Sequence, residues 1–105
     1  MNIDFISKRI TQLRIKKGIS EYKMSHDLGH GKSYINGIAN GKSLPSIPEL
    51  LYMCEYFEIT PMEFFDEKLE NPALIQKALD EMQELQDKDL ILLITLISRL
   101  KEKNE

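Results

Sequence analysis

Residues 20–41 limit most strongly what this chain can fold into, because two short helical patterns are separated by glycines. The first pattern predicts a helix over residues 21–28, with Ser20 placed to cap the free backbone N–H groups at its start. Gly29 and Gly31 then interrupt the pattern and provide the backbone freedom that a sharp turn requires.

A second short helix is predicted over residues 32–39, and Asn40 and Gly41 are suited to end it. The apolar residues with inward-facing spacing are Met24, Leu28, Ile35 and Ile38. That spacing would hold the two helices together at a wide angle. The residues left facing outward are Lys32, Ser33, Tyr34, Asn36 and Gly37. The major groove of DNA admits a short helix that offers polar and basic side chains.

At these residues the chain resembles the Cro/repressor type of helix-turn-helix domain, the xenobiotic-response-element-like (XRE) family of bacterial and phage regulators. The matching residues are Arg14, Gly18, Ile19, Ser20, Met24, Leu28, Gly29, Ser33, Ile35, Ile38, Asn40, Gly41, Lys42, Pro45, Ser46, Ile59, Pro61, Phe64 and Phe65. The resemblance implies an all-α fold, with a five-helix lambda-repressor-like DNA-binding domain over residues 1–65. We expect a linker over 66–71 and a C-terminal two-helix dimerisation hairpin over 72–105.

The resemblance also implies roles for single residues. Lys32 and Ser33 are the expected readers of base edges, since lysine can donate to guanine O6 and N7. Asn40 and Lys42 are expected to hold phosphates, and the other candidates assist at bases or phosphates. The candidate DNA-binding residues are Lys32, Ser33, Tyr34, Asn36, Gly37, Asn40, Lys42, Arg14, Lys17 and Lys23. The predicted function is a sequence-specific transcriptional regulator, with repression as its expected mode. It would bind a palindromic operator in double-stranded DNA as a homodimer through recognition helix 32–39.

Three departures from the family pattern keep a second hypothesis open. Glu21 stands where relatives commonly use a glutamine to bond a phosphate, and a carboxylate would be repelled there. Gly37 replaces a long polar side chain that often reaches a base. Ala39 replaces a glutamate that often pairs with the residue at the position of Arg14, so Arg14 contacts phosphate or has another partner. The alternative is a regulatory protein with this fold that binds a partner protein and has lost sequence-specific DNA readout.

The charges are divided along the chain in a way that favours DNA binding. The whole chain carries a net charge of −3, but residues 8–42 hold eight Lys/Arg against two acidic residues, a net +6. Residues 66–105 hold six Lys/Arg against ten Asp/Glu, a net −4. Electrostatic attraction falls off over about 8–10 Å, so a local basic patch can attract DNA despite acidic residues elsewhere.

After the motif, two further helices are predicted to complete the first domain. Ser46 and Glu49 have the spacing of a capping box before a helix that begins at Ile47. Thr60 and Glu63 repeat that spacing. The expected core residues of these two helices are Leu50, Leu51, Cys54, Phe57, Met62, Phe64 and Phe65.

The C-terminal third of the chain predicts an assembly region. Its last helix should run over about residues 88–103, and its apolar residues cover well over half of the circumference. One packed neighbour needs an apolar stripe of only about 100°, so the excess favours a second copy of the chain. The predicted dimerisation residues are Leu90, Leu93, Ile94, Ile97 and Leu100.

Other function classes have weaker sequence support. His26 and His30 have a ligand spacing with Asp27 between them, but Gly29 ends the helix and further ligands are not evident, so no metal site is expected. Without a glycine-rich phosphate loop or a nucleophile pattern, we expect neither an enzyme nor a cofactor. The lone Cys54 cannot form an internal disulfide, which favours a cytoplasmic setting. The longest apolar run is too short to span a bilayer, so no membrane partner is expected.

Overall fold

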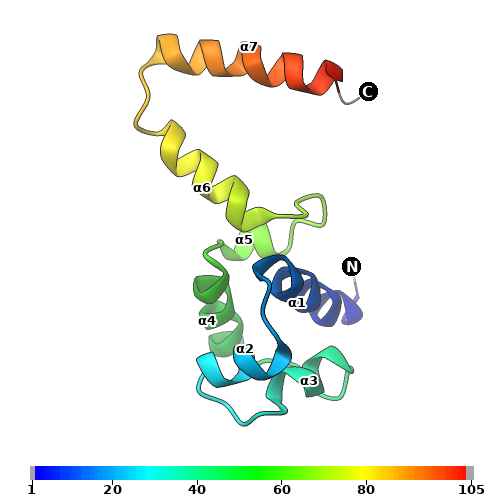
Figure 1. The fold of residues 1–105 in the computed structure, drawn as a ribbon. Helices are drawn as coiled ribbons and strands as arrows, with labels where there is room; N and C mark the ends of the chain where they lie inside the picture. Colours follow the sequence, from blue (N-terminus) through cyan, green and yellow to red (C-terminus); the bar gives the residue numbers. More distant parts are fainter. Residues whose placement is uncertain (1, 104–105) are drawn as a thin grey trace. The chain divides into compact units, whose positions relative to one another are not determined.

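The computed structural model describes residues 2–103, and within that range it contains seven α-helices and no strand (Figure 1). The helices are α1 (Asp4–Lys17), α2 (Glu21–Asp27), α3 (Tyr34–Ala39), α4 (Ile47–Phe57), α5 (Pro61–Phe64), α6 (Pro72–Met82) and α7 (Asp87–Lys103). The chain divides into two compact units, Met1–Ala73 and Leu74–Glu105. The predicted all-helical fold is confirmed.

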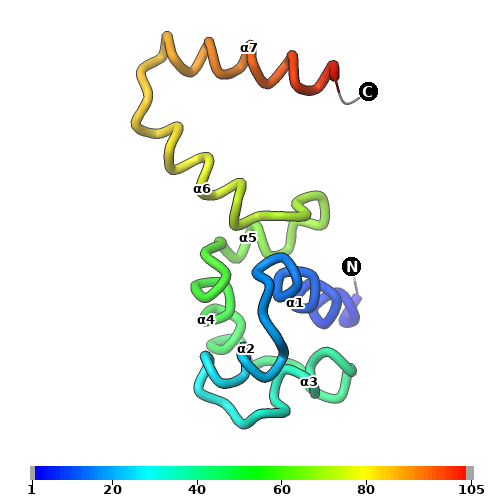
Figure 2. The backbone as a smooth tube through the Cα atoms, in the orientation of Figure 1, coloured from blue at the N-terminus to red at the C-terminus, as the bar shows by residue number. Residues whose placement is uncertain are grey.

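Local capping signals account for the first two helices. The apolar spacing of Ile6, Ile10 and Leu13 before Gly18 predicts a helix over about residues 4–17, and α1 has these bounds. It ends at Gly18, whose φ of 76° is left-handed and whose N–H donates to the carbonyls of Arg14 and Ile15. The Ser20 side chain caps α2 by accepting from the backbone N–H of Lys23 at 3.0 Å. Gly29 adopts a left-handed φ of 77°. The backbone turns between α2 and α3 (Figure 2).

The core of the first unit draws on α1 to α5 and on Ile59, which lies between α4 and α5. Its buried apolar residues are Ile10, Leu13, Met24, Ile35, Ile38, Leu50, Met53, Cys54, Phe57, Ile59 and Phe64. Full burial of one such large side chain contributes about 1.5–3 kcal/mol. The core therefore holds α3 against α1 and α2 mainly through Met24, Ile35 and Ile38, three of the four residues predicted to do so.

Three of the expected core residues in and beside α4 and α5 are exposed, namely Leu51, Met62 and Phe65, so these predictions are wrong. Leu51 is 49% exposed, and Met53 is buried in its place, because a residue three positions from Leu50 shares its helix face while the next residue does not. Met62 is 82% exposed, so Phe64 fills the core. The neighbouring Phe65 is only partly covered, and its ring stacks on that of Phe5 with centroids 6.1 Å apart.

The two predicted capping boxes also differ in outcome. At α5, the Thr60 hydroxyl accepts from the backbone N–H of Glu63, and the Glu63 carboxylate accepts from that of Thr60, so the predicted box is confirmed. At α4, Ser46 accepts from the N–H of Glu49 at 3.2 Å, which is half of a box. The carboxylate of Glu49 lies instead 2.9 Å from the imidazole of His30.

The segment between α5 and α6 is attached to the first unit by Arg9, which is only 2% exposed. The Arg9 guanidinium donates to the carbonyls of Phe64, Glu63 and Leu69, each at 2.7 Å. Burial lowers the pKa of Arg9, and the nearby Asp66 carboxylate partly opposes that shift. Pro72 is also buried, so residues 66–71 lie within the first compact unit, which extends to Ala73.

The second unit is built from most of α6 and from α7. In the described part of α7, no residue is buried. Large apolar side chains are exposed on both helices, including Leu74 and Leu79 on α6 and Leu92 and Ile94 on α7. Among residues 2–103, no helix is both long enough and apolar enough to cross a membrane.

Candidate nucleic-acid interface

The predicted recognition helix begins two residues later than expected. Helix α3 starts at Tyr34, because the turn that follows Gly29 continues through Lys32 and Ser33. Ser33 is the N-cap residue, but its side chain makes no capping hydrogen bond. Lys32 and Ser33, the two expected base readers, are therefore exposed residues of the turn that enters α3.

A buried serine on α2 provides the hydrogen bond that the start of α3 lacks. Ser25 is fully buried, and its hydroxyl accepts from the backbone N–H of Ile35 at 3.0 Å. The same hydroxyl donates to the carbonyl of Glu21 at 2.8 Å. Because a helix leaves its first N–H groups without intrahelical partners, this contact fixes the start of α3, the predicted recognition helix, to α2. Sequence reasoning missed Ser25, although it lies three residues before the inward-facing Leu28 and therefore shares its helix face.

The other end of α3 is fixed by α1 and by the loop that follows. The Ser7 hydroxyl donates to the carbonyl of Ile38 at 2.7 Å. Gly41 ends the helix with a left-handed φ of 74°. Gly37 lies against this loop, since a Cβ added to it would meet the Ser43 hydroxyl at 3.3 Å. Both ends of α3 are thus held by contacts with other parts of the first unit.

A chain of polar side chains crosses the exposed surface of α2 and α3. The Asn36 side-chain amide donates to Glu21 at 3.1 Å and accepts from the Asn40 amide at 3.0 Å. Two predicted DNA-binding residues, Asn36 and Asn40, are therefore hydrogen-bonded to each other, and Asn36 is also bonded to Glu21, which departs from the family pattern. The chain fixes the direction of the Asn36 amide before any ligand binds.

Three of the predicted DNA-binding cations have partners inside the protein. Arg14 donates to the carbonyl of Ile19 at 2.7 Å. This carbonyl is therefore the partner of Arg14 in place of the glutamate that Ala39 replaces. The Lys17 ammonium lies 5.0 Å from the centroid of the Tyr56 ring, a cation–π contact. Lys23 pairs with Asp27 at 2.8 Å.

Asp27 connects these contacts. Its second oxygen accepts from the Tyr56 hydroxyl at 2.7 Å. The hydrogen bond from Lys23, then that from Tyr56, lowers the pKa of the Asp27 carboxyl. Burial, followed by the hydrogen bond to Asp27, raises the pKa of Tyr56. Lys17 on α1, Asp27 on α2 and Tyr56 on α4 therefore belong to one small polar cluster.

Two predicted DNA-binding cations remain available to a ligand. Lys32 and Lys42 are exposed, and within residues 2–103 neither ammonium has a hydrogen-bond or ion-pair partner. Lys32 lies just before α3, and Lys42 lies just after it. A short helix with a free cation near each end offers two contacts for the phosphates and base edges of a duplex.

His30, one of the two histidines with metal-ligand spacing, contacts Tyr34 and Glu49. The His30 ring stacks on Tyr34, with centroids 3.7 Å apart and planes 7° from parallel. Burial, with a smaller contribution from the Glu49 carboxylate, raises the pKa of Tyr34. No group of three or more potential metal-ligating side chains gathers anywhere in residues 2–103.

Together, the glycine turn, the buried serine and the fixed second helix define a helix-turn-helix module. The family model described as "Helix-turn-helix domain" matches residues 7–70, more than half of the chain. The chain belongs to this family, and it is an XRE-type helix-turn-helix regulator. No curated protein and no solved structure matches the chain.

Proposed function

We propose that the protein is a transcriptional repressor that binds an inverted-repeat operator as a homodimer. In this proposal the first unit is a five-helix DNA-binding domain, and α6 and α7 form a hairpin that joins two copies. Occupying the operator is its mode of action, and it catalyses no reaction.

The observation that carries the proposal is the pair of free cations at the two ends of a fixed α3. Phosphate contacts from lysine supply much of the affinity of DNA-binding proteins, and contacts to base edges supply the specificity. Lys32 and Lys42 can serve these two roles without breaking an internal contact, whereas Arg14, Lys17 and Lys23 each have an internal partner.

A second candidate function rests on Glu21. Its carboxylate lies on the same surface as Asn36 and would be repelled by phosphate, which favours a partner protein with basic side chains. Under this alternative, the polar chain of Glu21, Asn36 and Asn40 would contact protein, and duplex DNA would bind weakly or not at all.

The salt dependence of binding to a random-sequence duplex separates the two candidates. For the full chain, log K against log salt concentration should be linear, and Lys42→Ala should flatten its slope by about 0.9 for each protomer that contacts DNA. Lys77→Ala removes an exposed lysine from α6 and is the matched control, whose slope should equal that of the wild type.

Equal slopes for the wild type and Lys42→Ala would contradict the phosphate contact that we assign to Lys42. The absence of any binding at 50 mM salt would contradict the DNA-binding function itself and favour the protein-binding candidate.

A further inference from the structure

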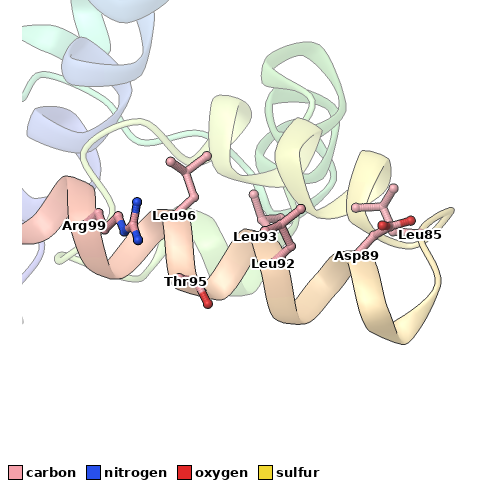
Figure 3. A pocket seen from close by; sticks show the side chains of 7 residues that line it. All are labelled: Leu85, Asp89, Leu92, Leu93, Thr95, Leu96 and Arg99. Atoms are coloured by element: carbon pink, nitrogen blue, oxygen red, sulfur yellow. The ribbon is translucent and has the colours of Figure 1, made fainter.

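One side of α7, together with Leu85 from the segment that precedes this helix, forms an apolar groove of about 470 Å³. Leu92, Leu93 and Leu96 line it between Asp89 and Arg99, which lie toward opposite ends of the row (Figure 3). Leu92 is 68% exposed and Leu96 is 52% exposed, so this surface is not covered within the second unit. A row of exposed leucines on one helix is typical of a surface that packs against another helix.

The spacing of the groove residues is that of a coiled-coil seam. Asp89, Leu92, Leu96 and Arg99 follow one another at intervals of three, four and three residues. This alternation keeps side chains on one stripe that faces a neighbouring helix along its length. The seam therefore has two leucines at its centre, the negative Asp89 at one end and the positive Arg99 at the other.

These charges determine which direction a second copy of α7 can run. In a parallel pair, Asp89 would face Asp89 of the partner subunit, and the two arginines would also face each other. In an antiparallel pair, Asp89 faces Arg99 of the partner subunit, and the same contact is repeated by symmetry. The antiparallel pair also places Leu92 beside Leu96 of the partner subunit. Like charges that face each other across a helix interface are unfavourable, whereas opposite charges fix register and orientation.

We propose that two copies of the protein pair through this seam with their α7 helices antiparallel. This inference rests on the homodimer of the proposed function and adds its face and direction. The two-fold axis crosses α7 at the level of residue 94, midway between Asp89 and Arg99. The first turn of α7 is acidic and includes Asp87, and its last turn is basic and includes Lys101. An antiparallel pair places the acidic turn of each copy beside the basic turn of the other.

The seam differs from the stripe that the sequence predicted for dimerisation. Ile94 is two residues from both Leu92 and Leu96, and so lies about 200° around the helix from each. Ile94 is also exposed, at 62%. Ile94→Glu therefore introduces the same charge as Leu92→Glu, but on the side of α7 that faces away from the proposed partner.

Sedimentation equilibrium of the full chain tests the seam through charge reversal. Asp89→Arg should place two arginines opposite each other at both ends of the seam, and Arg99→Asp should do the same with two aspartates. Each single variant should weaken dimerisation about tenfold or more, while Asp89→Arg/Arg99→Asp should restore the wild-type dissociation constant. Leu92→Glu should abolish the dimer at tens of micromolar, and Ile94→Glu should leave it largely intact.

Several outcomes would overturn the inference. In a parallel dimer, each reversal only exchanges one like-charge pair for another, so unchanged dimerisation of both single variants rules out the antiparallel seam. A dimer lost in Ile94→Glu but kept in Leu92→Glu places the interface on the other stripe. A wild-type monomer overturns the seam and the proposed homodimer together, and it would also result if α6 of the same chain filled the groove. Binding to the random-sequence duplex is measured separately, so a failure of DNA binding remains distinguishable.

Discussion

Ser25→Ala tests whether one hydroxyl fixes α3 to the rest of the first unit. The substitution removes the acceptor of the Ile35 N–H and the donor to the Glu21 carbonyl, and it leaves no exposed surface through which water could replace the first contact. The Glu21 carbonyl loses less, because a carbonyl in the first turn of a helix also accepts from the backbone N–H four residues later.

The expected magnitude follows from the burial of Ile35, which is 1% exposed. Leaving a buried backbone N–H without a partner costs about 1–3 kcal/mol. In a domain of this size, each 1 kcal/mol lowers the melting temperature by about 4–8 °C, so we expect a decrease of roughly 5–20 °C. Affinity for DNA should fall as well, since the turn that carries Lys32 ends next to this contact.

Thermal unfolding and hydrogen exchange together provide the assay. Ser43→Ala is the control, because Ser43 is exposed in the same unit and the change should alter stability by less than about 0.5 kcal/mol. The Ile35 amide should exchange faster in Ser25→Ala than in the wild type or the control. Unchanged protection of that amide, with stability equal to that of Ser43→Ala, would refute the role of Ser25.

Three further predictions concern α3, the turn before it and the polar cluster around Asp27. Gly37→Ala should change stability little, since the gain of about 1 kcal/mol in helix propensity is offset by contact with the Ser43 hydroxyl. Gly37→Ala/Ser43→Ala should recover that gain in thermal melts, and equal melting temperatures for the two variants would contradict the contact. Tyr56→Phe should raise the pKa of Asp27 toward its usual value in an NMR titration, because one of the two donors that lower it is lost. The lowered pKa stabilises the fold above about pH 4, and this contribution disappears as the pH falls through the pKa of the folded state. Lys32→Ala should relax base preference at one position in each half-site by about 1–3 kcal/mol in competition assays, and an equal loss on all sequences would contradict its reading role.

The features predicted correctly from sequence are those set by neighbouring residues. The bounds of α1, the Ser20 cap and the Thr60 capping box each depend on residues within one or two helical turns. Their signals are caps, a terminal glycine and apolar periodicity, which act on the backbone locally.

The features missed from sequence depend on residues far apart in the chain. Arg9 bonds to carbonyls at positions 63–69, which its own helix pattern does not indicate. The Glu49 carboxylate contacts His30 instead of capping the start of α4. The Ser25 hydroxyl accepts from the Ile35 N–H on the other side of the turn. For the candidate site, the residue types predicted which residues would face DNA. Only the structure shows that Lys32 and Lys42 are free, whereas the other predicted cations have partners within the protein.

Selection of bound sequences from a random pool of duplex DNA tests the central claim most directly. A two-fold dimer that enters successive major grooves should enrich an inverted repeat, with half-site centres about 10 bp apart or separated by whole helical turns. The wild-type full chain should yield such a motif at physiological salt. A pool that shows no enrichment after repeated rounds would contradict sequence-specific DNA binding by this protein.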